Sequence, residues 1–190
     1  MKMGKRITVL ACMLVLGIGL IEPLSRAAGD DSKAGEAFAA ALENGTIKYD
    51  SNSNYNIADM DGDGVKDLLV SKTSGNAFIY AYKDGSVKKI LKYLPEYDLC
   101  YNAKKGLFEE IGEGDGAWHI FHKLTNGKLV EKFRLYTEYK NGSKLVYRYQ
   151  KAGQSAKTLS KAAYNKKLKK QRGEYLQTSK EKLIDILKSL

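Results

Sequence analysis

Apolar and polar residues alternate along the chain from Thr46 to Gln150, with a period of two. On a β-strand this period places the apolar side chains on one face, so it predicts half-buried strands. The apolar positions expected to share a face within successive segments are Phe78, Tyr80 and Tyr82; Val87, Leu91 and Tyr93; Leu129, Phe133, Leu135 and Tyr139; and Leu145, Tyr147 and Tyr149.

Turn dipeptides separate several of these segments. Asp84-Gly85, Asn126-Gly127 and Asn141-Gly142 each place glycine after a residue that tolerates a positive φ angle. This is the chemistry of the type I′ turn, whose twist matches that of the two strands it joins. The alternation and the turns together predict a blade-like, antiparallel β-meander.

Helical spacing flanks this region on both sides. The stretch GEAFAAALENG predicts a short N-terminal helix that ends at Asn44-Gly45. After a linker, SKAAYNKKLKKQR predicts a helix capped by Ser160, with Ala163, Tyr164 and Leu168 facing inward. In TSKEKLIDILKSL, Thr178 and Glu181 have capping-box spacing, and an apolar stripe of Leu183, Ile184, Leu187 and Leu190 follows.

These elements define a mainly β (α+β) fold in one domain. We assign residues 28–155 to the first helix and the antiparallel sheet. Residues 156–190 are assigned to two C-terminal helices that pack on the sheet.

The first 27 residues have the pattern of a signal peptide. Lys2, Lys5 and Arg6 precede the uncharged run Ile7–Ile21, and the small residues at Ser25 and Ala27 suit a cleavage site after Ala27. The alternative is an uncleaved anchor, although the run of 15 residues is shorter than the roughly 20 that a spanning helix needs. We therefore expect a secreted or envelope-associated protein with no membrane span after cleavage.

The net charge of the chain without the signal segment indicates which partners an exported protein would attract. Without residues 1–27 the chain has 28 basic and 21 acidic residues, a net charge of +7. A basic exported protein is expected to favour an anionic wall polymer, glycan or lipid surface. Nucleic acid is not an expected partner, because the basic run at residues 166–172 lacks interleaved aromatic residues. Cys100 is the only cysteine outside the signal segment, and its apolar surroundings predict a buried thiol.

Acidic residues are concentrated in the stretch NIADMDGDGVKDLLV. Counting Asp59 as position 1, carboxylates stand at positions 1, 3, 5 and 9, and Val65 at position 7 can offer its carbonyl oxygen. Gly62 and Gly64 allow the loop to curl. Ca²⁺ takes six to eight oxygen ligands, and this spacing supplies most of them. The predicted ligands are Asp59, Asp61, Asp63, Val65 and Asp67.

The loop differs from an EF-hand, because position 12 is Val70 rather than glutamate and a strand follows. The pattern D-x-D-G-D-G-x-x-D instead resembles the calcium loop of FG-GAP and VCBS-type repeats. That resemblance implies a loop between two antiparallel strands, the four aspartates as side-chain ligands and Val65 as a carbonyl ligand. The layout as a whole also resembles short secreted proteins of clostridium-like bacteria that carry one such loop, a Tyr-rich meander and a terminal YNKKLKK-like helix.

Catalytic motifs are absent from the sequence. On a strand, the spacing of His119 and His122 sends the two rings to opposite faces, and Glu109 and Glu110 are expected at a solvated sheet edge. The leading hypothesis is a secreted, non-catalytic, Ca²⁺-stabilised protein that binds an extracellular or envelope ligand. The alternative is a small secreted hydrolase that uses carboxylates such as Glu110 and Asp115 near His119.

Overall fold

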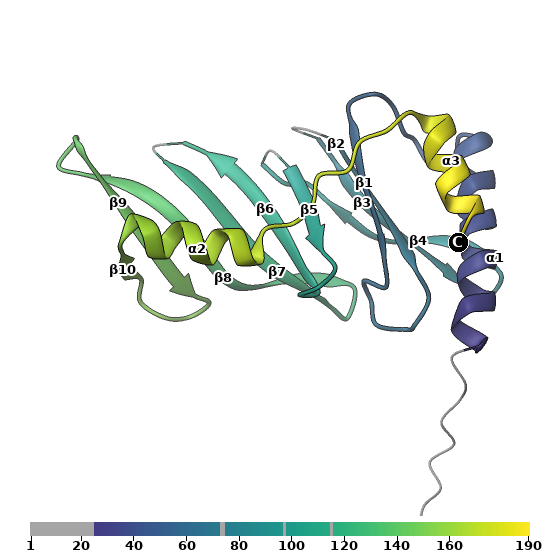
Figure 1. The fold of residues 1–190 in the computed structure, drawn as a ribbon, viewed down its shortest axis with the longest axis horizontal. Coiled ribbons are helices and arrows are strands. Elements are labelled where there is room, and N and C mark those ends of the chain that lie inside the picture. The colour runs from purple at the N-terminus through teal and green to yellow at the C-terminus, as the bar shows by residue number, and fades with distance from the viewer. Residues whose placement is uncertain (1–24, 73–74, 97, 115) are drawn as a thin grey trace, which may run out of the picture.

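The computed structural model describes residues 25–72, 75–96, 98–114 and 116–190. Within these residues the chain forms three helices and ten strands (Figure 1). The helices are α1 (Ser25–Glu43), α2 (Lys161–Gln171) and α3 (Lys180–Lys188). The strands are β1 (Ser53–Ala58), β2 (Asp67–Lys72), β3 (Ala77–Lys83), β4 (Ser86–Tyr93), β5 (Asp98–Asn102), β6 (Leu107–Glu113), β7 (Ala117–Thr125), β8 (Lys128–Lys140), β9 (Lys144–Lys151) and β10 (Lys157–Leu159).

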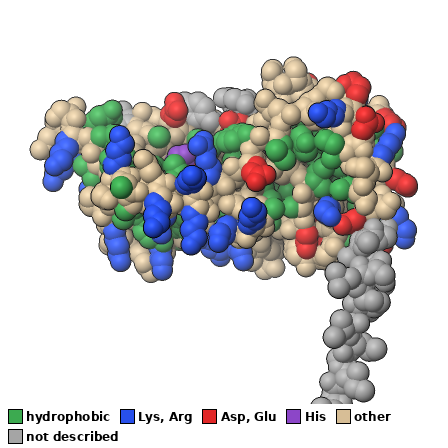
Figure 2. All heavy atoms as spheres, in the orientation of Figure 1, with side chains coloured by type: hydrophobic (Ala, Val, Ile, Leu, Met, Phe, Trp, Pro, Cys, Tyr) green, Lys and Arg blue, Asp and Glu red, His purple; other side chains and the backbone are tan. Residues whose placement is uncertain are grey.

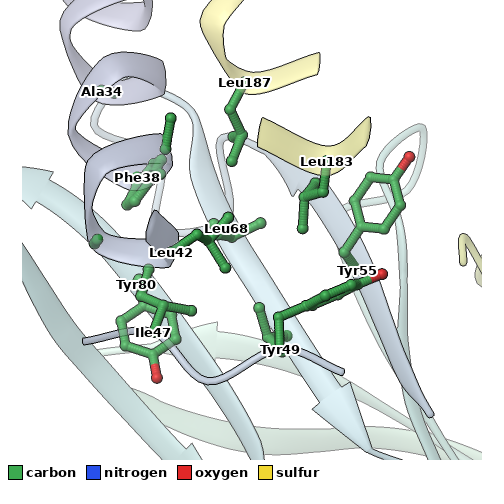
Figure 3. Packing of buried hydrophobic residues seen from close by; sticks show 13 residues of the cluster. Ala34, Phe38, Leu42, Ile47, Tyr49, Tyr55, Leu68, Tyr80, Leu183 and Leu187 are labelled. Atoms are coloured by element: carbon green, nitrogen blue, oxygen red, sulfur yellow. The ribbon is translucent and has the colours of Figure 1, made fainter. Parts of the chain in front are cut away.

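The first four strands form one antiparallel sheet in the order β1-β2-β3-β4. α1 and α3 pack side by side and contribute to a core with one face of this sheet (Figure 1). Phe38 and Leu42 of α1 meet Leu183 and Leu187 of α3 above Leu68 of β2 (Figure 3). All five side chains are buried, so their removal from water contributes to stability.

The last six strands form a second antiparallel sheet in the order β10-β9-β8-β7-β6-β5. α2 runs along one face of this sheet and contacts β9 (Figure 1). Tyr164 of α2 is buried in a cluster with Phe121 and Leu135. The ammonium group of Lys167 lies 4.2 Å from the centre of the Tyr149 ring, so this lysine also packs on the sheet.

The two sheets meet at one end of the larger sheet. Leu69 and Ile79 of the four-stranded sheet share a buried cluster with Leu99 and Phe108 of β5 and β6. The hydroxyl of Ser71 donates a hydrogen bond of 2.8 Å to the carbonyl of Leu99 within this contact. The face of the smaller sheet opposite the helices is therefore covered by β5, β6 and the Leu124 and Leu129 end of the β7–β8 hairpin, whereas β9 and β10 extend beyond this contact (Figure 1).

The connection between α2 and α3 crosses the edges of both sheets. The amide of Glu174 donates to the carbonyl of Tyr101 in β5 at 3.2 Å, and the carbonyl of Leu176 accepts from the amide of Tyr55 in β1 at 2.9 Å. The connection therefore links the two sheets.

The mainly β, antiparallel fold predicted from the sequence is confirmed. Both residues of each predicted turn dipeptide have a positive φ angle, from 50° at Asn126 to 75° at Gly85. Asp84-Gly85 and Asn126-Gly127 form two-residue hairpin loops, whereas the third loop also includes Ser143.

The predicted faces are wrong at two places, because register shifts interrupt the alternation. In β4 an extra residue, Ile90, lies between the partners of Ile79 and Tyr80. Val87 consequently packs on the α1 side, whereas Leu91 and Tyr93 pack on the opposite side. Lys132 is the extra residue in β8. A bulge of this kind reverses the face of every later residue in the strand.

The helix boundaries also differ from the prediction in part. α1 begins at Ser25, earlier than the short helix expected from the sequence, and so includes residues on both sides of the predicted cleavage point. Ser160 caps α2 as predicted, by accepting from the amide of Ala163, but the Ala163 side chain is exposed. The cap of α3 is Ser179 rather than Thr178, because the Thr178 backbone is used in hydrogen bonds with the Tyr49 hydroxyl.

Candidate metal centre

The acidic loop joins β1 to β2 in an antiparallel hairpin, where Ala58 pairs with Asp67. Gly62 and Gly64 have φ angles of +86° and +90°, values that residues with a side chain rarely adopt. Steric crowding is not the reason for these glycines, since a Cβ atom at either position would meet nothing within 4 Å. The glycines are therefore required by the curl of the loop.

Three of the predicted ligands are brought together by this curl. Asp59, Asp61 and Asp67 each offer a carboxylate oxygen, and these oxygens lie within 4.8 Å of one another. We call these residues the aspartate trio. Asp67 is only 1% exposed, and its Oδ2 accepts hydrogen bonds from the amides of Met60 (2.8 Å) and Asp61 (3.2 Å). The backbone of the loop thus fixes the deepest member of the trio.

The other carboxylates of the loop are also oriented by backbone amides. The two oxygens of Asp59 accept from Gly62 at 2.7 Å and from Gly64 at 3.1 Å. Asp63 accepts from the amide of Val65 at 2.9 Å. The bond from Val65, two residues after Asp63, is of the kind that stabilises a tight turn. All of these bonds restrict the orientation of the carboxylates.

Asp63 and Val65 belong to the same loop but lie outside the trio. One carboxylate oxygen of Asp63 is 3.6 Å from the ammonium group of Lys83. The side chain of Val65 packs against the core below α1. The structure therefore brings together Asp59, Asp61 and Asp67, and Asp63 is not part of this cluster.

Lys83, at the end of β3, is a charge partner that the sequence did not reveal. Its ammonium group lies 2.7 Å from Oδ2 of Asp61, and this hydrogen bond is the main reason that the pKa of Lys83 is raised. Burial is the main reason that the pKa of Asp67 is raised to about 7, and the charges of Asp61 and Asp63 raise it further. The single positive charge of Lys83 does not balance the carboxylates of the loop, which therefore has an excess of negative charge.

The donor set of the trio fits a hard cation. Carboxylate oxygens are the ligands that Ca²⁺, Mg²⁺ and Mn²⁺ prefer over softer metals. A divalent ion would offset the repulsion among the three carboxylates and would compete with Lys83 for Asp61. The trio could therefore hold a metal ion with ligands from a single loop.

Comparison of the chain with protein-family models, with curated proteins and with solved structures finds no match. None of the helices in the part of the chain that the structure describes combines the length and the apolar character needed to cross a membrane.

Two buried glutamate–histidine pairs lie away from the loop, on adjacent strands. Oε1 of Glu109 is 2.8 Å from Nδ1 of His119, and Oε2 of Glu110 is 3.1 Å from Nε2 of His122. Glu109 and Glu110 are 0% and 7% exposed, so the predicted solvated edge is wrong. The reason is that β6 is an internal strand, paired on both sides by β5 and β7.

The strand geometry separates these two pairs, because neighbouring residues point to opposite faces of a sheet. Glu109 and His119 lie on the face that packs against α2, and Glu110 and His122 lie on the face toward the four-stranded sheet. The predicted opposite orientation of the two histidines is therefore confirmed. Glu110 contacts His122 and not His119, so the predicted combination of Glu110 with His119 is not formed, and Asp115 lies outside the described residues.

Cys100 is buried, as predicted. Burial raises the pKa of its thiol, and the charge of Glu109 adds to this effect. A thiol that resists deprotonation is a poor nucleophile. Cys100 is therefore a small core residue of β5 that packs against the connection preceding α3.

Low pH should weaken the interaction of the Glu110 carboxylate with His122. Burial acts to raise the pKa of this carboxyl, but hydrogen bonds from His122 and Tyr93 outweigh burial and hold the pKa below its ordinary value of 4.5. A lowered pKa contributes stability that is present above pH 4.5 and is lost as the pH falls through the folded-state value. We expect the free energy of unfolding to fall less steeply below pH 4.5 in Glu110→Gln than in the wild type, as measured by urea denaturation. Equal slopes would contradict this role for the carboxylate.

Proposed function

We propose that this chain is an exported, non-catalytic β-protein that is stabilised by Ca²⁺ and attaches to an anionic ligand of the cell envelope. The observation that carries the proposal is the aspartate trio, whose carboxylate oxygens lie within 4.8 Å of one another. The loop connects antiparallel strands β1 and β2, which is the position implied by its resemblance to FG-GAP and VCBS-type loops. Ca²⁺ is the preferred ion, because it tolerates the irregular geometry of oxygen ligands from one flexible loop better than Mg²⁺ does.

In this proposal α2 supplies the attachment surface. The helix contains five lysines and no acidic residue. Lys161, Lys166, Lys169 and Lys170 are exposed, and Figure 2 shows Lys and Arg side chains gathered over this helix. Asp and Glu side chains are more frequent at the end of the molecule that carries α1 and α3 (Figure 2). An anionic polymer or lipid surface is therefore attracted to one side of the protein.

Not all of these lysines are needed for the fold. Lys169 and Lys170 lie in the last turn of α2, where positive charge also interacts favourably with the helix dipole. Lys167 packs on Tyr149. Lys166 has neither role, because it lies outside the last turn and its side chain is exposed. Its charge is thus available to a ligand.

The test is retention of the purified mature protein on cell-wall polymer and on anionic vesicles. Binding should occur at 0.1 M salt and be lost at 1 M, because the Debye length falls from about 10 Å to about 3 Å. The double charge reversal Lys166→Glu with Lys169→Glu should weaken retention at least about tenfold, because each exposed cation at an anionic surface contributes about 1 kcal/mol.

A control with the same change in net charge distinguishes the α2 surface from overall charge. Lys48 and Lys182 are exposed and lie outside α2. Lys48→Glu with Lys182→Glu should reduce retention less than the α2 variant does. Wild-type retention of the α2 double variant, with its circular dichroism spectrum unchanged, would reject the attachment surface and leave the metal site unaffected.

A further inference from the structure

The face of the six-stranded sheet opposite α2 carries a groove. The four-stranded sheet packs on this face at the β5–β6 end and at the Leu124 and Leu129 end of the β7–β8 hairpin, whereas α2 packs on the opposite face. The groove has a volume of about 630 Å³, within the range typical of small-ligand sites. Its floor and walls include Trp118, Ile120, Arg134, Tyr136, Glu138 and Gln150.

Trp118 forms a flat part of the groove floor. It pairs across the strands with Gly112 of β6, and a Cβ atom on Gly112 would lie 1.9 Å from the indole carbon Cζ2. The ring therefore lies over the bare backbone of Gly112, a position that any larger residue would prevent. The indole is half-buried and also lines the groove, so one side rests on β6 and the other is available to a ligand.

Tyr136 extends this aromatic floor to the next strand. It is the cross-strand partner of Trp118 on β8 and is also half-buried. Directly opposed residues on neighbouring strands have Cβ atoms about 5 Å apart. Two aromatic side chains thus stand next to each other in the groove, where their apolar surface is only partly removed from water.

Two arginine–glutamate pairs border this floor. The guanidinium of Arg134 donates to both carboxylate oxygens of Glu131, at 2.9 Å and 2.6 Å. Arg148 donates to Glu138 at 2.6 Å. Glu96 and Glu113 also line the groove, and their negative charge disfavours a polyanion. The groove therefore offers aromatic faces and polar hydrogen-bonding groups to a ligand without net negative charge.

We propose that this groove binds a neutral saccharide chain. The C–H face of a sugar ring is apolar and stacks on an aromatic side chain, while the hydroxyl groups at its edge bond to amide, guanidinium and carboxylate groups. Trp118 and Tyr136 supply the stacking surface, and Gln150, Arg134 and Glu138 supply the polar groups. This site and the basic surface of α2 lie on opposite faces of the same sheet, so the inference does not depend on the anionic ligand or on calcium.

The chain contains a single tryptophan, so its fluorescence reports directly on this groove. The protein would be titrated with cellohexaose, maltohexaose, xylohexaose and hexa-N-acetylchitohexaose, each of which is neutral. We expect a saturable change in the fluorescence of Trp118 with at least one of them. Tyr136→Ala should weaken that binding by about tenfold or more, as the loss of an aromatic contact with its buried surface predicts.

Tyr139→Ala provides the matched control. Tyr139 is on the same strand, is 56% exposed and points to the opposite face, so its removal should leave binding unchanged. Gln150→Ala removes a polar group without touching the aromatic floor. It should weaken binding even if Tyr136→Ala does not fold.

Three results would overturn the proposal. The first is the absence of a saturable change with all four saccharides. The second is wild-type binding by both folded Gln150→Ala and Tyr136→Ala. The third is a shift of Trp118 emission with protein concentration, accompanied by a dimer in analytical ultracentrifugation, which would assign the groove to a second copy of the chain.

Discussion

Millimolar Ca²⁺ should raise the melting temperature of the purified mature protein by about 5–10 °C over its value in EDTA. Only the folded chain assembles the aspartate trio, so an ion bound there stabilises the folded state by RT ln(1 + [L]/Kd), about 2.7 kcal/mol at 100 times Kd. For a domain of this size each kcal/mol corresponds to about 2–4 °C. The same concentration of Mg²⁺ should produce a smaller shift, because this ion requires a stricter octahedral arrangement of ligands.

Substitutions within the trio distinguish this site from nonspecific effects of salt. Asp59→Asn and Asp61→Asn retain the shape of the side chain and remove its charge, and each should abolish most of the calcium-dependent shift. Glu113→Gln removes an exposed carboxylate on β6 and should leave the shift unchanged. A melting temperature that is the same in EDTA and in millimolar Ca²⁺ would reject the calcium site.

The sequence predicted the features of the fold that depend on neighbouring residues. Alternation of polar and apolar residues indicates strands, and turns such as Asn126-Gly127 depend on the φ angles of two adjacent residues. The cap at Ser160 is equally local. The pairing of the strands and their division into two sheets depend on packing between distant segments, such as that of Leu69 against Phe108. Alternation alone carries no information about those contacts.

The bulges at Ile90 and Lys132 are a second feature that the alternation within one strand does not predict. In both strands the alternation continues through the sequence, but the extra residue reverses which side chains face the core. Tyr93 thereby reaches Glu110, to which its hydroxyl donates a hydrogen bond of 2.6 Å. A register shift is decided by how the partner strand packs, so the face of Tyr93 could not be predicted from β4 alone.

The sequence also predicts the candidate metal centre only in part. The spacing of Asp59, Asp61 and Asp67 follows from the oxygen ligands that a hard cation requires. Lys83 belongs to another strand, and its contact with Asp61 arises only when β3 pairs with β2. The buried pair of Glu109 and His119 likewise requires β6 to pair with β7. Adjacent charged residues such as Glu109 and Glu110 are usually solvated, which is why the sequence predicts a solvated edge for them.

Glu109→Ala should lower the free energy of unfolding by about 2–5 kcal/mol, because it leaves several buried groups without a partner. The carboxylate accepts a hydrogen bond of 2.6 Å from the amide of Gly173 and lies 2.8 Å from Nδ1 of His119. Gly173 approaches β5 so closely that a Cβ atom on it would lie 2.9 Å from Sγ of Cys100. Water therefore has little room to replace the carboxylate.

The effect should also extend to the connection between α2 and α3, which Glu109 fixes through Gly173. Urea denaturation would measure the change, and Glu109→Gln should cost less than Glu109→Ala because its amide oxygen still accepts one of these hydrogen bonds. Glu113 lies on the same strand but is exposed, so Glu113→Ala should change the stability by less than about 0.5 kcal/mol. If Glu109→Ala is as stable as Glu113→Ala, the buried carboxylate does not hold the connection to the sheet.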